Sequence, residues 1–169
     1  ANADVLPFDY AATARTVMGY LTEVEDAAEA SGIPLDLSDA RTEARRLGQA
    51  AVGLQEEMTR IFNGFTPDEL RGFRPVFREI NSHLISVERG FLHEEGLPGR
   101  PWYRHQLYAP GYLTGYGAKT LPGIREAVEG GRAEEARAMA IVLTGRLQEA
   151  TSRLRRALLL SRGVLPPLG

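Results

Sequence analysis

Side chains able to carry acid–base or metal chemistry are few in this 169-residue chain, and they lie apart along it. The three histidines are His83, His93 and His105, and the absence of cysteine excludes thiolate ligands and disulfide bonds. No histidine lies in a His-Glu-x-x-His motif or in the Glu-x-x-His arrangement of di-metal helix bundles. Neither a Gly-x-Ser-x-Gly turn nor a phosphate-binding glycine loop occurs. We therefore predict no catalytic residue, no metal site and no cofactor in this chain.

Two groupings come nearest to a metal or acid–base site. Glu79 and His83 are four residues apart and would share a helix face. Two ligands are fewer than a metal site needs, so the pair is more typical of a surface contact. The run His93-Glu94-Glu95 follows the end of a predicted helix, and we interpret it as a solvated charge cluster.

The segment 96–124, GLPGRPWYRHQLYAPGYLTGYGAKTLPGI, concentrates the aromatic residues. It holds the single Trp and four of the six Tyr, and it lacks a helical pattern. A connection of this length inside a compact domain is usually either functional or disordered. Disordered segments are poor in aromatic residues, so we predict an ordered, functional loop.

Composition restricts the class of protein and the kind of partner. With 43% hydrophobic residues, the chain is long enough for one domain with a substantial core. A net charge of −2 gives no general attraction to nucleic acid or anionic lipid, so we predict neither as a partner. No apolar run is long enough to span a bilayer, and we expect a soluble piece.

The elements that position the loop are predicted to be helices. In four stretches, apolar residues recur at alternating spacings of three and four, which places each set on one helix face. Such spacing favours axes crossing at roughly 20°, as in a helix bundle. The fold class is therefore all-α, a four-helix bundle with the long aromatic, Gly/Pro-rich loop between the third and last long helices. The four sets are Tyr10, Ala14, Val17, Leu21, Val24 and Ala28; Ala40, Ala44, Leu47, Ala51, Leu54, Met58 and Ile61; Phe77, Ile80, Leu84, Val87 and Phe91; and Ala136, Ala140, Leu143, Leu147, Ala150, Leu154 and Ala157.

Helix ends can also be predicted. Thr66-Pro67-Asp68-Glu69 has the pattern of a capping box with proline at the first helical position, so a helix should begin there. Pro75 would clash with that helix, which should break near Gly72 before a longer helix starts at Pro75. A short helix should begin at 121–123 and end near Glu129.

Four stretches of the sequence resemble one known family. They are VLPFDY at 5–10, NSHLISVERGFL at 81–92, RPWYRHQLYAP at 100–110 and GYGAKTLPGI at 115–124. In this order they resemble the transferrin receptor-like dimerisation domain, the C-terminal helical domain of glutamate carboxypeptidase II-type M28 zinc peptidases and of transferrin receptors. The resemblance covers nearly the whole chain and predicts one such domain over residues 4–165.

The resemblance implies a function shared with a second domain. In this family the helices build a homodimer interface, and the aromatic loop packs against a separate peptidase domain and closes part of its substrate cleft. Zinc belongs to that peptidase domain, which is expected upstream, so this chain is expected to be a non-catalytic part of a carboxypeptidase or aminopeptidase. Its predicted partners are a second copy and its own peptidase domain. Family members are exported or membrane-anchored, while this sequence alone leaves localisation open.

The resemblance also assigns roles within the loop. In glutamate-specific members, a Lys-Tyr pair holds the free carboxylate of the substrate through charge-assisted hydrogen bonds. Tyr116 matches the tyrosine and is the predicted substrate-binding residue, but Gly115 replaces the lysine, so we expect a broader or different specificity. Lys119 could substitute only if the loop folds back. The residues expected to anchor the loop are Arg104, His105, Trp102, Tyr103 and Tyr108, with Arg104 and His105 bonding backbone carbonyls.

Two other interpretations stay open. The domain could serve a non-enzymatic transferrin receptor-like protein. It could also be a stand-alone interaction or nucleic-acid-binding module, because the last helix is rich in arginine. The first helix is acidic, however, so that basic face could be paired within the fold or across a dimer.

The run Leu158-Leu159-Leu160 is the predicted dimer or interdomain surface. Three successive residues point around a helix and cannot all face one core. At least one of them should meet a partner, unless the helix is buried on several sides within the same chain.

Overall fold

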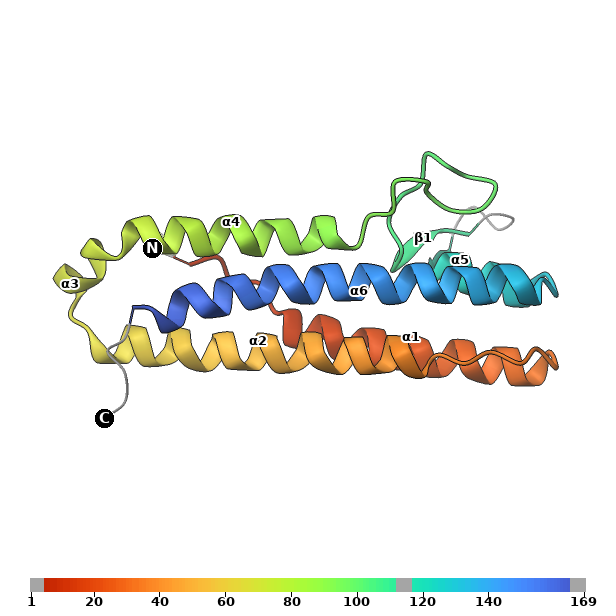
Figure 1. Ribbon diagram of the computed structural model, residues 1–169, viewed down its shortest axis with the longest axis horizontal. Helices are drawn as coiled ribbons and strands as arrows, with labels where there is room; N and C mark the ends of the chain where they lie inside the picture. Colours follow the sequence, from red (N-terminus) through yellow and green to blue (C-terminus); the bar gives the residue numbers. More distant parts are fainter. Residues whose placement is uncertain (1–4, 112–116, 165–169) are drawn as a thin grey trace.

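The computed structural model describes residues 5–111 and 117–164. Two of its six helices are short, and the only strands in the described residues form a small hairpin (Figure 1). In chain order the elements are α1 (Tyr10–Ala30), α2 (Ser38–Gly64), α3 (Pro67–Gly72), α4 (Arg74–Gly90), β1 (Tyr108–Pro110), β2 (Ala118–Thr120), α5 (Pro122–Glu129) and α6 (Ala133–Arg162).

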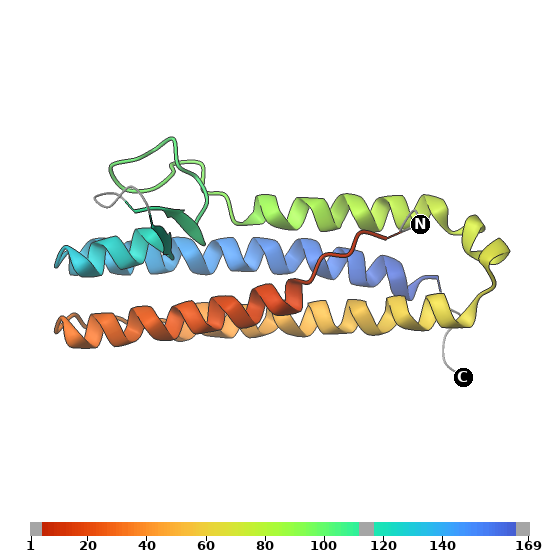
Figure 2. The same cartoon turned by 180° about the vertical axis from the view of Figure 1, so that it is seen from behind.

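The four long helices form an elongated bundle around α6. Helices α2 and α6 lie side by side and run in the same direction, while α1 and α4 run the opposite way (Figures 1 and 2). Helix α6 contacts α2, α4 and α5, and α1 packs on α2 and α5. The hairpin and α5 lie at the end of the bundle away from α3 (Figure 2). The predicted four-helix architecture is confirmed.

The core consists of the predicted apolar stripes. Every residue of the four sets is buried, including Leu21, Leu47, Ile80 and Leu147, each 0% exposed. At about 1.5–3 kcal/mol per large apolar side chain removed from water, these stripes dominate the free energy that holds the helices together. Each helix therefore forms because its apolar face has a partner, not because of intrinsic propensity alone.

Helices α4 and α6 are in close backbone contact where the loop begins. A Cβ added to Gly90, the last residue of α4, would lie 2.9 Å from the backbone N and Cα of Ala150. Only glycine allows this separation without a shift of the backbone. The contact fixes the end of α4 against α6 and so determines where the loop leaves the bundle.

The helix start and the helix break predicted between α2 and α4 are also present. The Thr66 side chain accepts a bond from the Glu69 backbone N–H, and a Glu69 carboxylate oxygen accepts one from the Thr66 backbone N–H at 2.8 Å. Helix α3 ends at Gly72 and α4 begins at Arg74, one residue before Pro75. Pro75 therefore lies in the first turn of α4, where backbone N–H groups have no partner within the helix, so its lack of an N–H costs no hydrogen bond.

The loop contains a feature that the sequence analysis did not predict. Strands β1 and β2 pair antiparallel, with Tyr108 opposite Thr120 and Pro110 opposite Ala118. Each strand has three residues, too few for a pattern of alternating polarity to be recognised.

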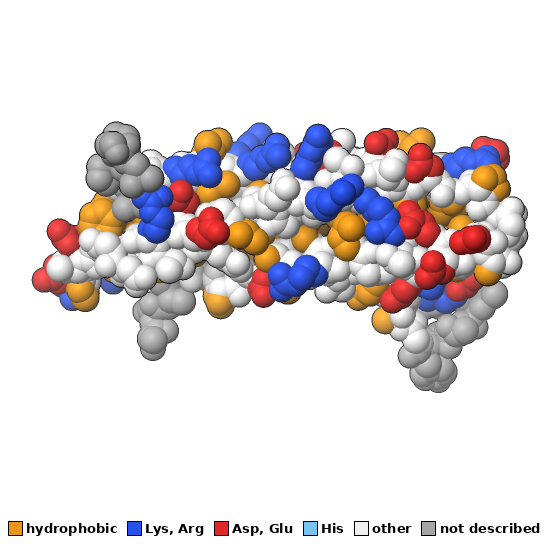
Figure 3. Space-filling view, turned by 90° about the horizontal axis from the view of Figure 1, so that it is seen from below, with side chains coloured by type: hydrophobic (Ala, Val, Ile, Leu, Met, Phe, Trp, Pro, Cys, Tyr) orange, Lys and Arg blue, Asp and Glu red, His pale blue; other side chains and the backbone are white. Residues whose placement is uncertain are grey.

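Ion pairs join the helices across the surface. On α1, Glu25 pairs with Arg41 of α2, and Glu23 pairs with Arg125 of α5 at 2.7 Å. Basic and acidic side chains are accordingly interspersed on the face shown in Figure 3. None of the described helices is both long and apolar enough to span a bilayer.

Candidate functional site

The segment between α4 and α5 is the candidate functional site, and backbone bonds attach it to the end of α4. The backbone N–H of His93 donates to the carbonyl of Arg104 at 2.9 Å, and that of Gln106 donates to the carbonyl of Phe91 at 3.0 Å. The chain therefore leaves α4, turns through residues 94–103 and returns alongside its own start. This return brings residue 107 to the bundle, and the hairpin begins directly after it.

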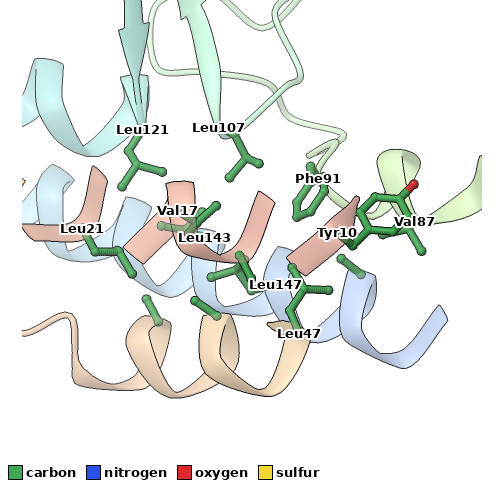
Figure 4. Close-up of a cluster of buried hydrophobic side chains, with 14 of the residues drawn as sticks. Tyr10, Val17, Leu21, Leu47, Val87, Phe91, Leu107, Leu121, Leu143 and Leu147 are labelled. Atoms are coloured by element: carbon green, nitrogen blue, oxygen red, sulfur yellow. The ribbon is translucent and has the colours of Figure 1, made fainter. Parts of the chain in front are cut away.

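Leu107 and Leu121 embed the base of the hairpin in the bundle core. Each is 1% exposed, and the Leu121 backbone N–H donates to the Leu107 carbonyl at 2.8 Å. Figure 4 shows both side chains pointing from the hairpin towards Val17 and Leu143. Leu121 has φ of 46°, an uncommon value for a non-glycine residue. Burial of its side chain holds the backbone in this strained conformation, from which α5 starts.

Arg100 ties three parts of the site together. Its side chain is 8% exposed, and Nη2 donates to both carboxylate oxygens of Glu126, on α5, at 2.7 Å. Nη1 donates to the carbonyl of Pro110, the last residue of β1. The guanidinium carbon also lies 5.8 Å from the ring centroid of Tyr103, within cation–π range. Both oxygens of the carboxylate therefore share one guanidinium nitrogen, in charge-assisted hydrogen bonds that are stronger than neutral ones.

His105 and Tyr108 support the hairpin from the α4 side. Their rings are stacked, with centroids 4.6 Å apart. Nδ1 of His105 accepts the backbone N–H of Leu107 at 3.3 Å, so the imidazole bonds a backbone amide and not the expected carbonyl. Burial lowers the pKa of His105, consistent with a neutral ring. Burial, with a smaller effect of Glu88, raises the pKa of Tyr108.

The remaining loop residues predicted to anchor the site lie in different environments. Tyr103 is half-buried and packs against the core. Trp102 is 75% exposed, so it does not pack into this loop, and Arg104 is also exposed. The buried guanidinium is that of Arg100, which the sequence analysis missed because a sequence does not show which of two nearby arginines is buried.

Some of the residues proposed to recognise substrate lie among the described residues and others do not. Gly115 and Tyr116 lie outside the described residues. Lys119, on β2, forms an ion pair with Glu129, the last residue of α5. Its ammonium group is therefore already engaged by a carboxylate. Tyr108, on β1 opposite Thr120, is 43% exposed and accessible.

The three leucines near the end of α6 separate as their helical positions require. Leu158 is buried at 9% exposed, Leu160 is half-buried, and Leu159 is 65% exposed. Leu159 is therefore the one whose surface is available to a partner.

The described residues contain no cluster of three or more side chains that could bind a metal ion. The nearest grouping is His93 and Glu95, whose Nε2 and Oε2 atoms are 3.8 Å apart.

Comparison with known proteins finds one matching family profile and several similar proteins. The profile of the transferrin receptor-like dimerisation domain matches residues 35–155. A protein named as a probable glutamate carboxypeptidase in Arabidopsis thaliana is 26% identical over 165 residues, which is 98% of this chain and 22% of that protein. Another of that name, from Arthroderma benhamiae, is 30% identical over 132 residues, 78% of this chain and 17% of its own length.

A third relative carries a different name. A Schizosaccharomyces pombe protein named as an inactive zinc metalloprotease is 28% identical over 141 residues, 80% of this chain and 17% of that protein. The chain spans about a fifth of the length of these curated relatives. Since the profile covers most of its residues, the chain belongs to the transferrin receptor-like dimerisation domain family.

Proposed function

We propose that this chain is the non-catalytic dimerisation domain of a larger glutamate carboxypeptidase-like zinc peptidase. In this proposal the helices bind a second copy, and the loop between α4 and α5 contributes to a substrate cleft formed with a peptidase domain. The family match and the names of the relatives support the proposal. Zinc would be held by the peptidase domain, outside this sequence.

The observation that carries the proposed role of the loop is the way its base is held. Leu107, Leu121 and Arg100 are buried in or against the bundle, whereas Trp102 and Tyr108 are substantially exposed. A loop fixed by a buried ion pair and two core leucines keeps its outer side chains in place before any partner arrives. Recognition groups that are positioned in advance lose less conformational entropy on binding.

The specificity of the cleft is proposed to differ from that of glutamate-specific members. Tyr116 would supply a phenol hydroxyl, but Gly115 supplies no ammonium group where those members have lysine. Lys119, the nearest candidate replacement, is paired with Glu129. Losing a charge-assisted hydrogen bond removes about 1.5–3 kcal/mol of preference for a carboxylate, so neutral C-terminal side chains should compete well.

The test restores the missing charge in the full open reading frame that encodes this domain. Gly115→Lys should raise kcat/KM for peptides ending in glutamate about tenfold over peptides ending in leucine, since 1.4 kcal/mol is a factor of ten. Tyr116→Phe should lower kcat/KM for both classes. Gly64→Lys is the matched control, because Gly64 is exposed at the C-terminal end of α2, at the end of the bundle opposite the hairpin. An unchanged ratio in Gly115→Lys, together with unchanged activity in Tyr116→Phe, would exclude the loop from the cleft.

Catalysis by the larger protein is a separate part of the proposal. One relative is named as an inactive zinc metalloprotease, so the domain occurs in proteins without peptidase activity. The dimerisation role does not depend on an active peptidase domain and can be tested with this chain alone.

A further inference from the structure

Two hollows follow the flank of α6 that faces α2. One, of about 820 Å³, lies between the α1–α2 turn and the first half of α6; the other, of about 400 Å³, lies between α2 and the second half of α6. Gln148 lines both, so the two hollows adjoin each other along the pair of helices. We call this surface the α2–α6 face.

Exposed apolar side chains stand at both ends of the α2–α6 face. Ile141 is 75% exposed in the third turn of α6, and Leu159 is 65% exposed in its last turn. They are 18 residues apart, which is five turns, so they project from the same side of α6 about 27 Å apart. Between them, Gly145 and Ser152 are small and would allow another helix to approach closely.

The charges without an ion-pair partner on this face are separated by sign. Asp36 and Asp39 line the hollow beside Ile141, whereas Arg155 and Arg156 line the hollow beside Leu159. The first hollow is also lined by Arg137 and the second by Glu43 and Arg46, but Arg137 pairs with Glu134 and Glu43 pairs with Arg46. Within the described part of the chain, neither Asp39 nor the two arginines make an ion pair, whereas Arg137, Arg153 and Arg162 of the same helix do. The charges left without an ion pair are therefore acidic at one end of the face and basic at the other.

This pattern is self-complementary in one orientation. If a second copy lies antiparallel across a two-fold axis, the acidic end of each chain meets the basic end of the other, and the contact forms twice. The same operation places Ile141 opposite Leu159 of the other copy, with Gln148 and Ser152 near the axis. A parallel arrangement would instead oppose like charges at both ends.

The geometry points to the α2–α6 face as the surface on which a second copy of this chain docks, antiparallel and two-fold symmetric. The inference rests on the proposed dimerisation and specifies its face and register. Complementary charges select the antiparallel register, and the two apolar contacts supply the buried area at its ends.

Charge reversal tests this register. Asp39→Lys alone, and Arg155→Glu with Arg156→Glu, should each weaken self-association of the 169-residue chain at least about tenfold, because both create repulsion at both ends. An equimolar mixture of the two variants should recover association, since the lysine introduced at position 39 of one variant then faces the glutamates introduced at positions 155 and 156 of the other, while Asp39 of the second variant faces Arg155 and Arg156 of the first. Arg15→Glu with Arg89→Glu, on exposed positions of α1 and α4, is the control and should behave as wild type.

A cross-linking measurement checks the geometry without relying on charge. The chain has no cysteine, so Ile141→Cys and Leu159→Cys introduce single thiols. Mixed together and oxidised, the two variants should form a disulfide-linked heterodimer faster than either forms a homodimer. Ile85→Cys, exposed on α4, should not cross-link specifically.

The outcomes separate this inference from the function on which it rests. If the wild-type chain is dimeric but charge reversal leaves it so, or the mixture fails to recover association, the assignment of the face is overturned while dimerisation stands. If each cysteine variant links to itself faster than to the other, the register is overturned. If the wild-type chain is monomeric throughout, the proposed dimerisation fails and the inference fails with it.

Discussion

Arg100 holds together three segments of the connection that follows α4: its own turn, the end of β1 and helix α5. A buried guanidinium is stable here because its forked donors meet a carboxylate and a carbonyl. Its neighbour Arg104 is exposed. Sequence resemblance identified the segment that contains both residues. It could not identify the anchoring one, because burial depends on how the turn places each side chain relative to α5.

Replacement of Arg100 should therefore destabilise the protein. Arg100→Ala leaves the Glu126 carboxylate largely buried without its guanidinium partner, and the loss of one member of a buried pair costs about 3–5 kcal/mol. Urea denaturation followed by circular dichroism would measure the change. Arg104→Ala is the matched control and should alter the free energy of unfolding by less than about 0.5 kcal/mol. Equal losses from both substitutions would contradict the anchoring role of Arg100.

His105 should give the protein a specific sensitivity to acid. Burial lowers its pKa, so the folded state keeps the ring neutral at pH values where the unfolded chain already binds a proton. Unfolding then takes up a proton, and the free energy of unfolding falls as pH drops below about 6.5, by at most about 1.4 kcal/mol per pH unit.

The comparison with His105→Phe isolates this contribution. The variant keeps a ring against Tyr108 but removes the titrating group, so its stability should change less between about pH 7 and 5. The lowered pKa values of Asp36 and Glu69 cause a further loss only at lower pH, and they affect both proteins alike. Parallel stability curves for wild type and variant across that range would show that His105 does not titrate differently on folding.

At the scale of elements, the long helices could be predicted and the hairpin could not. Residues three and four apart share a helix face, so the stripes could be counted directly, and each of their members is buried. The hairpin forms because Leu107 and Leu121 reach the core between helices from distant parts of the sequence. Its short strands carry no periodic signal of their own, so only the assembled bundle specifies them.

The approach of α4 to α6 gives a prediction at this scale. Gly90→Ala would place a Cβ 2.9 Å from the backbone of Ala150 and should destabilise the protein by about 1–3 kcal/mol through overpacking. Gly19→Ala is the control, since Gly19 is an exposed α1 residue with nothing within 4 Å of the added carbon. It should stabilise α1 by about 0.5–1 kcal/mol. Thermal unfolding of both variants checks the contrast, and a stabilising Gly90→Ala would contradict the close contact.

At the scale of the whole molecule, two regions of the bundle have different proposed roles. One end of the bundle fixes a loop through buried groups, and the long α2–α6 face presents unpaired charges and exposed apolar side chains in a self-complementary order. The sequence analysis anticipated a partner surface among Leu158, Leu159 and Leu160. It could not define the face, which requires the register between α2 and α6.

The most direct test of the central claim is the mass of the 169-residue chain in solution, measured by light scattering across a dilution series. The proposed dimerisation predicts twice the mass of one chain at high concentration, falling towards the mass of one chain on dilution. Ile141→Asp and Leu159→Asp should shift this transition to higher concentration, and Ile85→Asp should leave it unchanged. A mass of one chain at every concentration would contradict the claim that this domain dimerises by itself.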